Sequence, residues 1–304
     1  MCGIIAYKWK KDGVRIVLDG LRRLEYRGYD SWGIAVPGSA IKVVKDVGRV
    51  GEVSTDQLGS LGAQQPVAMG HSRWATTGAV TVFNAHPHLS NDGRIGLIHN
   101  GIVENFHALK NELLSNGFTF ASETDSEVIA NLIQYLWRGQ SLAEAVRQAF
   151  LRLQGRNAMV VMERDTKQLI GVRFGSPLIV GVGDGEYFFA SDVPAFLEHT
   201  RTVNYLDDNQ MVVLDETLSY LDVKTGEPIE RRTLTIDWSA EQAEKGEYPY
   251  FMIKEIMEQK DTIRRSVEQD MKEIEEAAAI IKKSRGAFLV GCGTSGKVCH
   301  VAEY

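Results

Sequence analysis

Short apolar runs separated by turns fill the first three quarters of the chain and constrain its fold more than any other feature. Between Gly3 and residue 236 they include GIIAYKW, WGIAV, PVAMG, RIGLIHN, NAMVVME and PLIVGVG. Runs of this length and composition predict strands. Amphipathic segments between them, such as residues 14–24, predict helices packed on the resulting sheets. We therefore expect an α+β domain over residues 1–236.

A polar segment and a second unit follow. Residues 237–249 read DWSAEQAEKGEYP and predict a linker. Residues 250–304 contain a long charged helical stretch, the run AFLV, which predicts a buried strand, and the glycine-rich segment GCGTSGK. One strand and one helical turn cannot cover a doubly wound sheet. We interpret residues 250–304 as the truncated N-terminal part of an α/β domain.

Charge and cysteine content exclude several classes of protein. Lys and Arg number 34 against 40 Asp and Glu, and the formal net charge of -6 repels polyanions, so we expect no nucleic-acid partner. The three cysteines lie at opposite ends of the chain and make no disulfide framework. The N-terminus lacks a signal peptide, and no segment approaches the roughly 18 apolar residues of a membrane span. We predict a cytoplasmic protein with no membrane partner.

Cys2 is a candidate nucleophile because of its position in the chain. If Met1 is removed, as is expected before a small residue, the thiol lies beside a free α-amino group. That amine titrates near about 7.7 to 8.0, so its neutral form can take the thiol proton directly or through water. A small buried hydrophobe is the ordinary interpretation of an isolated cysteine. The surrounding motifs decide between a nucleophile and a buried hydrophobe.

Those motifs are MCGI, EYRGYDS, HSRWATTG, NAHPH, HNGIVEN and SETDSE. Together they resemble the class II glutamine amidotransferases of the N-terminal nucleophile family. LRRLEYRGYDS with RWAT, HNGI and the later GCGTS is similar to the family of glucosamine-6-phosphate synthases, over essentially the whole chain. The resemblance implies a four-layer αββα N-terminal nucleophile hydrolase fold, then a helical linker and the truncated start of a sugar-isomerase domain.

The resemblance also implies a reaction. Cys2 attacks the side-chain amide of L-glutamine, releases ammonia and leaves a γ-glutamyl thioester that water hydrolyses to glutamate. In the resembling aminotransferases, ammonia passes to fructose 6-phosphate and gives glucosamine 6-phosphate for amino-sugar biosynthesis. Because the second isomerase domain of those enzymes is missing here, we expect this chain to complete only the glutaminase half. The chemistry needs no cofactor.

A pocket for free glutamine needs a cation for the α-carboxylate and an anion for the α-ammonium. Arg73 offers a planar fork for a carboxylate, and the resemblance assigns it that partner. The resemblance assigns Asp125 to the α-ammonium. Taken alone, the two residues would be a solvated arginine and an acid in the first turn of a helix.

Asn100 and Gly101 are the candidates for stabilising the tetrahedral oxyanion. The asparagine amide donates hydrogen bonds while neutral, and glycine lets its backbone N–H come close to the reacting carbon. Each such donor is typically worth about 2.7 to 4 kcal/mol. Outside this context an ordinary Asn-Gly turn is the alternative.

Trp74 and Thr76 belong to a loop that closes over glutamine in the resembling enzymes. Thr76 can donate its hydroxyl to the substrate, and Trp74 can exclude water. A core tryptophan and a solvated threonine are the ordinary alternatives. The chain departs from the family pattern at Thr77, where a histidine is usual, and at Trp32, which replaces a smaller residue.

Three further residues have competing interpretations. Arg27 is expected near Cys2 as a substrate-site cation that favours thiolate, and a surface ion pair is the alternative. His86 and His88, at i and i+2, could suggest metal ligands. No third ligand is evident and the chemistry needs none, so we predict no metal site.

The segment GCGTSGK matches the start of a nucleotide-binding P-loop. Val298 stands where a hydroxyl would hold Mg²⁺, which argues against a nucleotide site. Hydroxyls and backbone N–H groups at a helix start can instead bind a phosphate monoester. The resemblance matches Thr294 and Ser295 to phosphosugar-binding positions of an incomplete site, and a packing loop is the alternative.

Two other functions stay open. One is a different amidotransferase, such as a phosphoribosyl-transferring or asparagine-forming enzyme, although GCGTS argues against it. The other is a non-catalytic or partner-dependent chain that binds glutamine or a phosphosugar, which a retained Met1 would favour. A homodimer and an association with the missing isomerase part are both compatible with the sequence.

Overall fold

The computed structural model describes residues 2–237, 246, 248, 251–291 and 294–302. The chain divides into two compact units, Met1–Glu244 and Lys245–Tyr304. All the strands that the structure describes lie in the first unit. None of the described helices is long and apolar enough to span a membrane.

The first unit contains two antiparallel sheets. The strands of the larger sheet are β1 (Gly3–Trp9), β2 (Ser31–Val36), β3 (Lys42–Val47), β4 (Val67–Arg73), β9 (Ile179–Val182), β10 (Glu186–Ala190), β11 (Thr202–Tyr205) and β14 (Leu234–Thr235). They are ordered β14-β11-β9-β10-β1-β4-β2-β3. The smaller sheet consists of β5 (His88–Leu89), β6 (Ile95–Gly101), β7 (Asn157–Glu163), β8 (Leu169–Phe174), β12 (Gln210–Leu214) and β13 (Leu218–Asp222). Its order is β13-β12-β8-β7-β6-β5.

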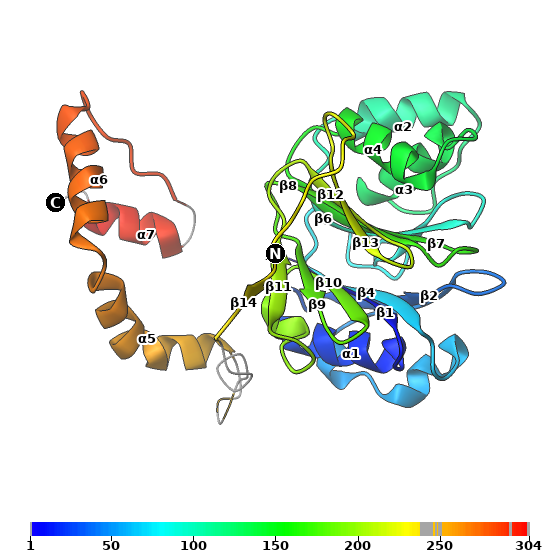
Figure 1. Ribbon diagram of the computed structural model, residues 1–304, viewed down its shortest axis with the longest axis horizontal. Coiled ribbons are helices and arrows are strands. Elements are labelled where there is room, and N and C mark those ends of the chain that lie inside the picture. Colours follow the sequence, from blue (N-terminus) through cyan, green and yellow to red (C-terminus); the bar gives the residue numbers. More distant parts are fainter. Residues whose placement is uncertain (1, 238–245, 247, 249–250, 292–293, 303–304) are drawn as a thin grey trace. The chain divides into compact units, whose positions relative to one another are not determined.

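Helices cover the outer faces of both sheets (Figure 1). The α-helices of this unit are α1 (Gly13–Arg23), α2 (Phe106–Ser115), α3 (Ser126–Leu136) and α4 (Leu142–Arg152). Short 3-10 helices are η1 (Glu25–Arg27), η2 (Val50–Glu52), η3 (Thr55–Leu61) and η4 (Val193–Ala195). The first α-helix packs on the larger sheet, and the other three pack on the smaller one. The α+β, four-layer αββα prediction is confirmed.

Alternation along β1 shows how the layers are built. Ile5 and Tyr7 belong to the cluster that contains α1, whereas Ile4 and Ala6 belong to the cluster between the two sheets. Successive side chains of a strand point to opposite faces, and all four are fully buried. A central strand apolar on both faces therefore needs a covering layer on each side, which explains why the run GIIAYKW does not alternate with polar residues.

The second unit contains α5 (Phe251–Val267), α6 (Met271–Lys283) and α7 (Thr294–Val301). Among its described residues no apolar side chain is buried. The prediction of a buried strand over AFLV is wrong in this chain, since residues 287–290 form no strand and Phe288 is 97% exposed. A strand needs a neighbour for its backbone hydrogen bonds, and the described part of this unit offers none.

Candidate active site

The predicted nucleophile lies where the ends of strands from both sheets meet. Cys2 immediately precedes β1, whose first residue, Gly3, pairs with Ser72 near the end of β4. Asn100, near the end of β6 in the other sheet, donates from Nδ2 to the backbone oxygen of Cys2 over 2.9 Å. This hydrogen bond joins the two sheets at the nucleophile, so the fold itself sets the distance between thiol and carboxamide.

The thiol of Cys2 is held by the backbone of Trp74. Its Sγ accepts a hydrogen bond from the Trp74 N–H at 3.2 Å and lies 3.5 Å from the Trp74 carbonyl oxygen. Burial raises the pKa of this thiol, while the Trp74 N–H and the charge of Arg73 act in the opposite direction. Because burial dominates, thiolate formation requires a nearby base.

Two cavities adjoin Cys2. The larger has a volume of about 380 Å³, and the smaller has a volume of about 20 Å³. Cys2, Trp74, Thr76 and Gly101 line both of them. The remaining predicted residues of this domain are divided between them, Arg27 and Asn100 along the larger and Arg73 and Asp125 along the smaller. The structure thus brings together every residue predicted for glutamine chemistry.

Arg73 is buried, so the alternative of a solvated arginine is wrong. Its guanidinium donates to the carbonyl oxygens of Thr77 at 2.6 Å, Gly78 at 3.3 Å and Ala79 at 3.1 Å. These bonds fold the loop over the smaller cavity, which then has room for about one water molecule. A carboxylate that binds the Nη atoms of Arg73 would compete with these carbonyl oxygens.

Asp125 occupies the N-cap position of α3, and its side chain makes no capping hydrogen bond. Its Oδ2 instead accepts from the backbone N–H of Val103 at 2.7 Å. The carboxylate is buried and lines the smaller cavity. Stabilising its own helix end therefore does not account for the orientation of this side chain.

Asn100 and Gly101 form no turn, because both belong to β6. Gly101 has a φ of +139°, and a Cβ there would lie 2.0 Å from the carbonyl oxygen of Arg156. Only glycine tolerates both conditions. The backbone at the end of β6 can therefore adopt this path beside Cys2 without a steric clash.

The loop after β4 is anchored on both sides of Trp74. The Trp74 ring packs edge-on against Tyr29, with centroids 5.5 Å apart, and Asp30 accepts the backbone N–H of Ala75. Trp74 is 47% exposed, so the alternative of a core tryptophan is wrong. Of the two departures from the family pattern, Thr77 lines the smaller cavity, whereas Trp32 is buried in the cluster that contains α1.

Arg27 lines the larger cavity beside Cys2. Its Nη2 donates to Asp192 Oδ2 at 2.6 Å, and the hydroxyl of Tyr26 donates to the same oxygen. Nε and Nη1 of Arg27 are buried without a hydrogen-bond partner among the described residues. The ion pair with Asp192 balances the charge of Arg27 beside the cavity.

Sequence patterns singled out His86 and His88 and missed His71 and His99, which are buried and line the smaller cavity. His71 stacks on His86, and His86 meets His88 edge-on. His99 Nδ1 lies 2.8 Å from Ser126 Oγ. Burial lowers the pKa of each, that of His71 to about 3. Within the described residues, no group of three or more His, Cys, Asp or Glu could hold a metal ion.

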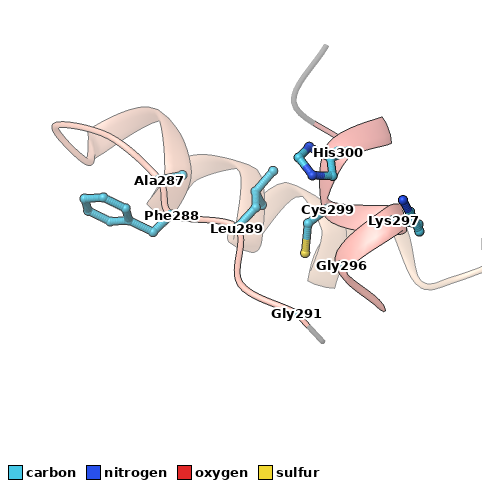
Figure 2. Close-up of a pocket in the computed structure, with 8 residues that line it drawn as sticks. All are labelled: Ala287, Phe288, Leu289, Gly291, Gly296, Lys297, Cys299 and His300. Carbon is cyan, nitrogen blue, oxygen red and sulfur yellow. The ribbon is translucent and has the colours of Figure 1, made fainter. Parts of the chain in front are cut away.

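The predicted phosphosugar positions lie at the start of α7. Cys292 and Gly293 lie outside the described residues, as does the side chain of Thr294, and Ser295 is exposed. A Cβ at Gly291 would lie 2.7 Å from the backbone carbon of Ser295, so the loop can pass this close only with glycine there. A cavity with a volume of about 490 Å³ lies beside this loop. Figure 2 shows the residues that line it, which belong to 287–291 and to α7.

Comparison with known proteins identifies the family. Residues 43–227 match the family model of the glutamine amidotransferase domain. A glutamine–fructose-6-phosphate aminotransferase (isomerizing) of Thermus thermophilus is 43% identical over 311 residues, covering 100% of this chain and 51% of the relative. The Methanothermobacter thermautotrophicus protein of the same name is 44% identical over 312 residues, covering 100% and 52%. The chain thus spans about half the length of these relatives.

Solved structures agree with this assignment. The glutamine phosphoribosylpyrophosphate amidotransferase of B. subtilis has a TM-score of 0.63 and 25% identity, over 74% of this chain and 50% of that one. A structure described as the allosteric regulatory enzyme of purine biosynthesis has a TM-score of 0.65 and 26% identity, over 74% and 49%. The chain belongs to the glutamine amidotransferase family.

Proposed function

We propose that this chain is the glutaminase half of a glutamine–fructose-6-phosphate aminotransferase, with Cys2 as an N-terminal nucleophile. One observation carries the proposal: Asn100 donates from its carboxamide to the backbone oxygen of Cys2, and both residues line a cavity of about 380 Å³, which is large enough for glutamine. The curated relatives at 43% and 44% identity favour the sugar-phosphate acceptor over a phosphoribosyl acceptor, for which the structural neighbours are only 25% and 26% identical.

Removal of Met1 precedes the reaction and frees the α-amino group of Cys2. The freed α-amino group of Cys2 takes the thiol proton, and the thiolate attacks the carboxamide carbon of glutamine. The new oxyanion accepts hydrogen bonds from the Asn100 side chain and the backbone N–H of Gly101. The ammonium of Cys2 then returns a proton to the leaving nitrogen. Ammonia departs, and water hydrolyses the remaining γ-glutamyl thioester to glutamate.

Arg73 and Asp125 select the zwitterion. Arg73 exchanges carbonyl oxygens of residues 77–79 for the two oxygens of the substrate carboxylate, which replaces bonds to neutral acceptors by charge-assisted ones. Asp125 retains the Val103 N–H and accepts the substrate ammonium. Thr76 adds a hydroxyl, and Arg27 lines the larger cavity with Cys2 as a cation that favours thiolate.

We extend the proposal to the domain boundaries and to the acceptor. Residues 1–236 form the glutaminase domain, 237–249 the linker, and 250–304 the beginning of a sugar-isomerase domain. Thr294 and Ser295 would hold the phosphate of fructose 6-phosphate in the complete enzyme. The close approach of Gly291 to Ser295 and Gly296 in the first turn of α7 supports this, because a helix N-terminus offers backbone N–H groups to a phosphate.

Glutamate release from L-glutamine tests the proposal. The purified chain, with its N-terminus checked by intact mass, is compared with Cys2→Ala, each with and without fructose 6-phosphate. We expect turnover by the processed chain, none by Cys2→Ala, and no amino sugar from either. No turnover by a processed and folded chain would contradict the autonomous glutaminase and favour a partner-dependent or non-catalytic chain.

A further inference from the structure

The oxyanion donor has two possible orientations, and only one is useful. The side chain of Asn100 carries a carbonyl oxygen on one side and an NH₂ group on the other. Only the NH₂ group can donate to an oxyanion. If the amide flipped by 180°, its oxygen would face the reaction and repel the developing negative charge. Whatever fixes the amide orientation therefore contributes to catalysis.

Asn100 lies between two polar neighbours. On one side, the backbone oxygen of Cys2 is 2.9 Å from Nδ2. On the other, Nε2 of His71 is 3.0 Å from Oδ1. A backbone carbonyl can only accept, so the first contact requires the NH₂ group to face Cys2. One hydrogen of that group is used there, and the second is left for the substrate.

The proton on His71 is determined by a third group. Its Nε2 also lies 3.0 Å from the backbone oxygen of His99, which again can only accept. His71 must therefore carry its hydrogen on Nε2, and it shares that hydrogen between the oxygens of His99 and Asn100. A flipped Asn100 would direct its NH₂ group at this N–H, and two donors would be opposed in a buried site.

The surroundings hold the His71 ring in place. It stacks on His86, with centroids 4.1 Å apart and planes 21° from parallel. His86 is itself fixed because its Nδ1 accepts the backbone N–H of His99 at 3.2 Å. His71 Nδ1 is buried and has no hydrogen-bond partner among the described residues, as suits an unprotonated nitrogen. Burial also lowers the pKa of His71 to about 3, so the ring stays neutral at neutral pH.

We propose that His71 is a positioning residue for the glutaminase reaction, whose Nε2–H holds the oxygen of Asn100 so that the NH₂ group faces the oxyanion. The inference rests on the proposed function, since it assigns His71 a role in that reaction. It predicts that loss of His71 weakens the binding of species that carry a tetrahedral oxyanion. Binding of planar ligands is expected to change little.

Two ligands separate these effects. The γ-aldehyde analogue of glutamate adds the Cys2 thiol across its carbonyl group and forms a tetrahedral hemithioacetal, whereas L-glutamate presents a planar γ-carboxylate to which the thiol does not add. In His71→Phe, which keeps a ring for stacking on His86, we expect aldehyde affinity to fall at least about tenfold relative to glutamate affinity, with kcat falling and KM nearly unchanged. His71→Gln is expected to restore part of the loss, because its amide N–H can take the place of Nε2–H.

His88→Phe is the matched control. His88 is buried in the same set of rings and bonds to Thr124 instead of Asn100. We expect it to leave the ratio of aldehyde to glutamate affinity unchanged. An unchanged ratio of aldehyde to glutamate affinity in His71→Phe would overturn the inference, whether both affinities fall equally or neither falls. A wild-type chain that neither turns over glutamine nor binds the aldehyde would instead refute the proposed function.

A measurement on the unmutated chain protects the test against variants that fail to fold. The ¹⁵N chemical shifts of His71 report which ring nitrogen carries hydrogen. We expect a protonated Nε2 and a bare Nδ1 from about pH 5 to pH 8, because the ring is buried and neutral. A hydrogen on Nδ1 with a bare Nε2 would overturn the inference, since His71 could then donate nothing to Asn100.

Discussion

The role of Asp125 can be tested by Asp125→Asn with almost no other change. Asparagine keeps an oxygen acceptor for the Val103 N–H, and no capping bond to α3 is lost because none exists. The substitution removes the charge that we propose faces the substrate ammonium. A hydrogen bond to a charged group is worth about 1.5 to 3 kcal/mol, so KM for glutamine should rise roughly 10- to 150-fold. Since the ammonium is remote from the reacting amide, kcat should change little.

Steady-state glutamate release measures this effect, and a second substrate shows its origin. Glutaramate is glutamine without the α-amino group. The unmutated enzyme should prefer glutamine to glutaramate by about the factor that Asp125→Asn loses, and the variant should discriminate little between them. Asp12→Asn is the control, because Asp12 caps α1 by accepting the N–H of Val14 and lies outside both cavities. We expect its KM to stay unchanged.

Two results would refute the reasoning. One is an Asp125→Asn variant that still prefers glutamine by the full factor, which would place the ammonium elsewhere. The other is a rise in KM that is matched by a loss of folding stability in urea. We expect the stability to change by no more than about 1 kcal/mol, the size of a charge effect at a helix N-terminus.

Two further predictions concern the backbone and the buried histidines. Gly101→Ala should lose roughly 3 kcal/mol or more of stability, because the added Cβ would lie 2.0 Å from the carbonyl oxygen of Arg156 and the φ of residue 101 is positive. A variant as stable in urea as the unmutated chain would contradict this geometry. His71, His86, His88 and His99 have lowered pKa values in the fold, so below about pH 6.5 the unfolded chain takes up protons that the folded one does not. Stability is therefore fully present at about pH 8, and at about pH 5.5 His71 alone, whose pKa in the fold is about 3, should cost roughly 1.4 kcal/mol. Urea unfolding at the two pH values measures this loss, and an unchanged midpoint would refute it.

The sequence predicted those features that depend on local pattern. The run GIIAYKW forms a central strand because it is apolar on both faces, and residues 14–24 supply the buried side of α1. AFLV is also apolar yet forms no strand, because the described part of its unit offers no neighbour to pair with. Composition therefore predicts which secondary structure a segment can form, and the neighbouring segments decide whether it forms.

The active site shows the same division between local sequence pattern and tertiary contacts. Motifs placed Cys2, Asn100 and Asp125 at strand and helix ends, and the fold brings those ends together. The contact between His71 and Asn100 joins residues on different sheets, and no sequence pattern encodes it. A signal existed in HSRW: His71 stands two residues before Arg73 on one strand, so both side chains point to the same face. The bonds from Arg73 to its own loop were not foreseeable from sequence, because they depend on the path of the loop.

The central claim is that Cys2 forms a thioester with the glutamyl group. The most direct test is intact-mass and peptide analysis of the chain quenched in acid during turnover of L-glutamine. We predict a γ-glutamyl adduct on a peptide that begins with Cys2, absent from Cys2→Ala and lost when glutamine is exhausted. Glutamate formation by Cys2→Ala at the unmutated rate, or full turnover by a chain that retains Met1, would contradict the account.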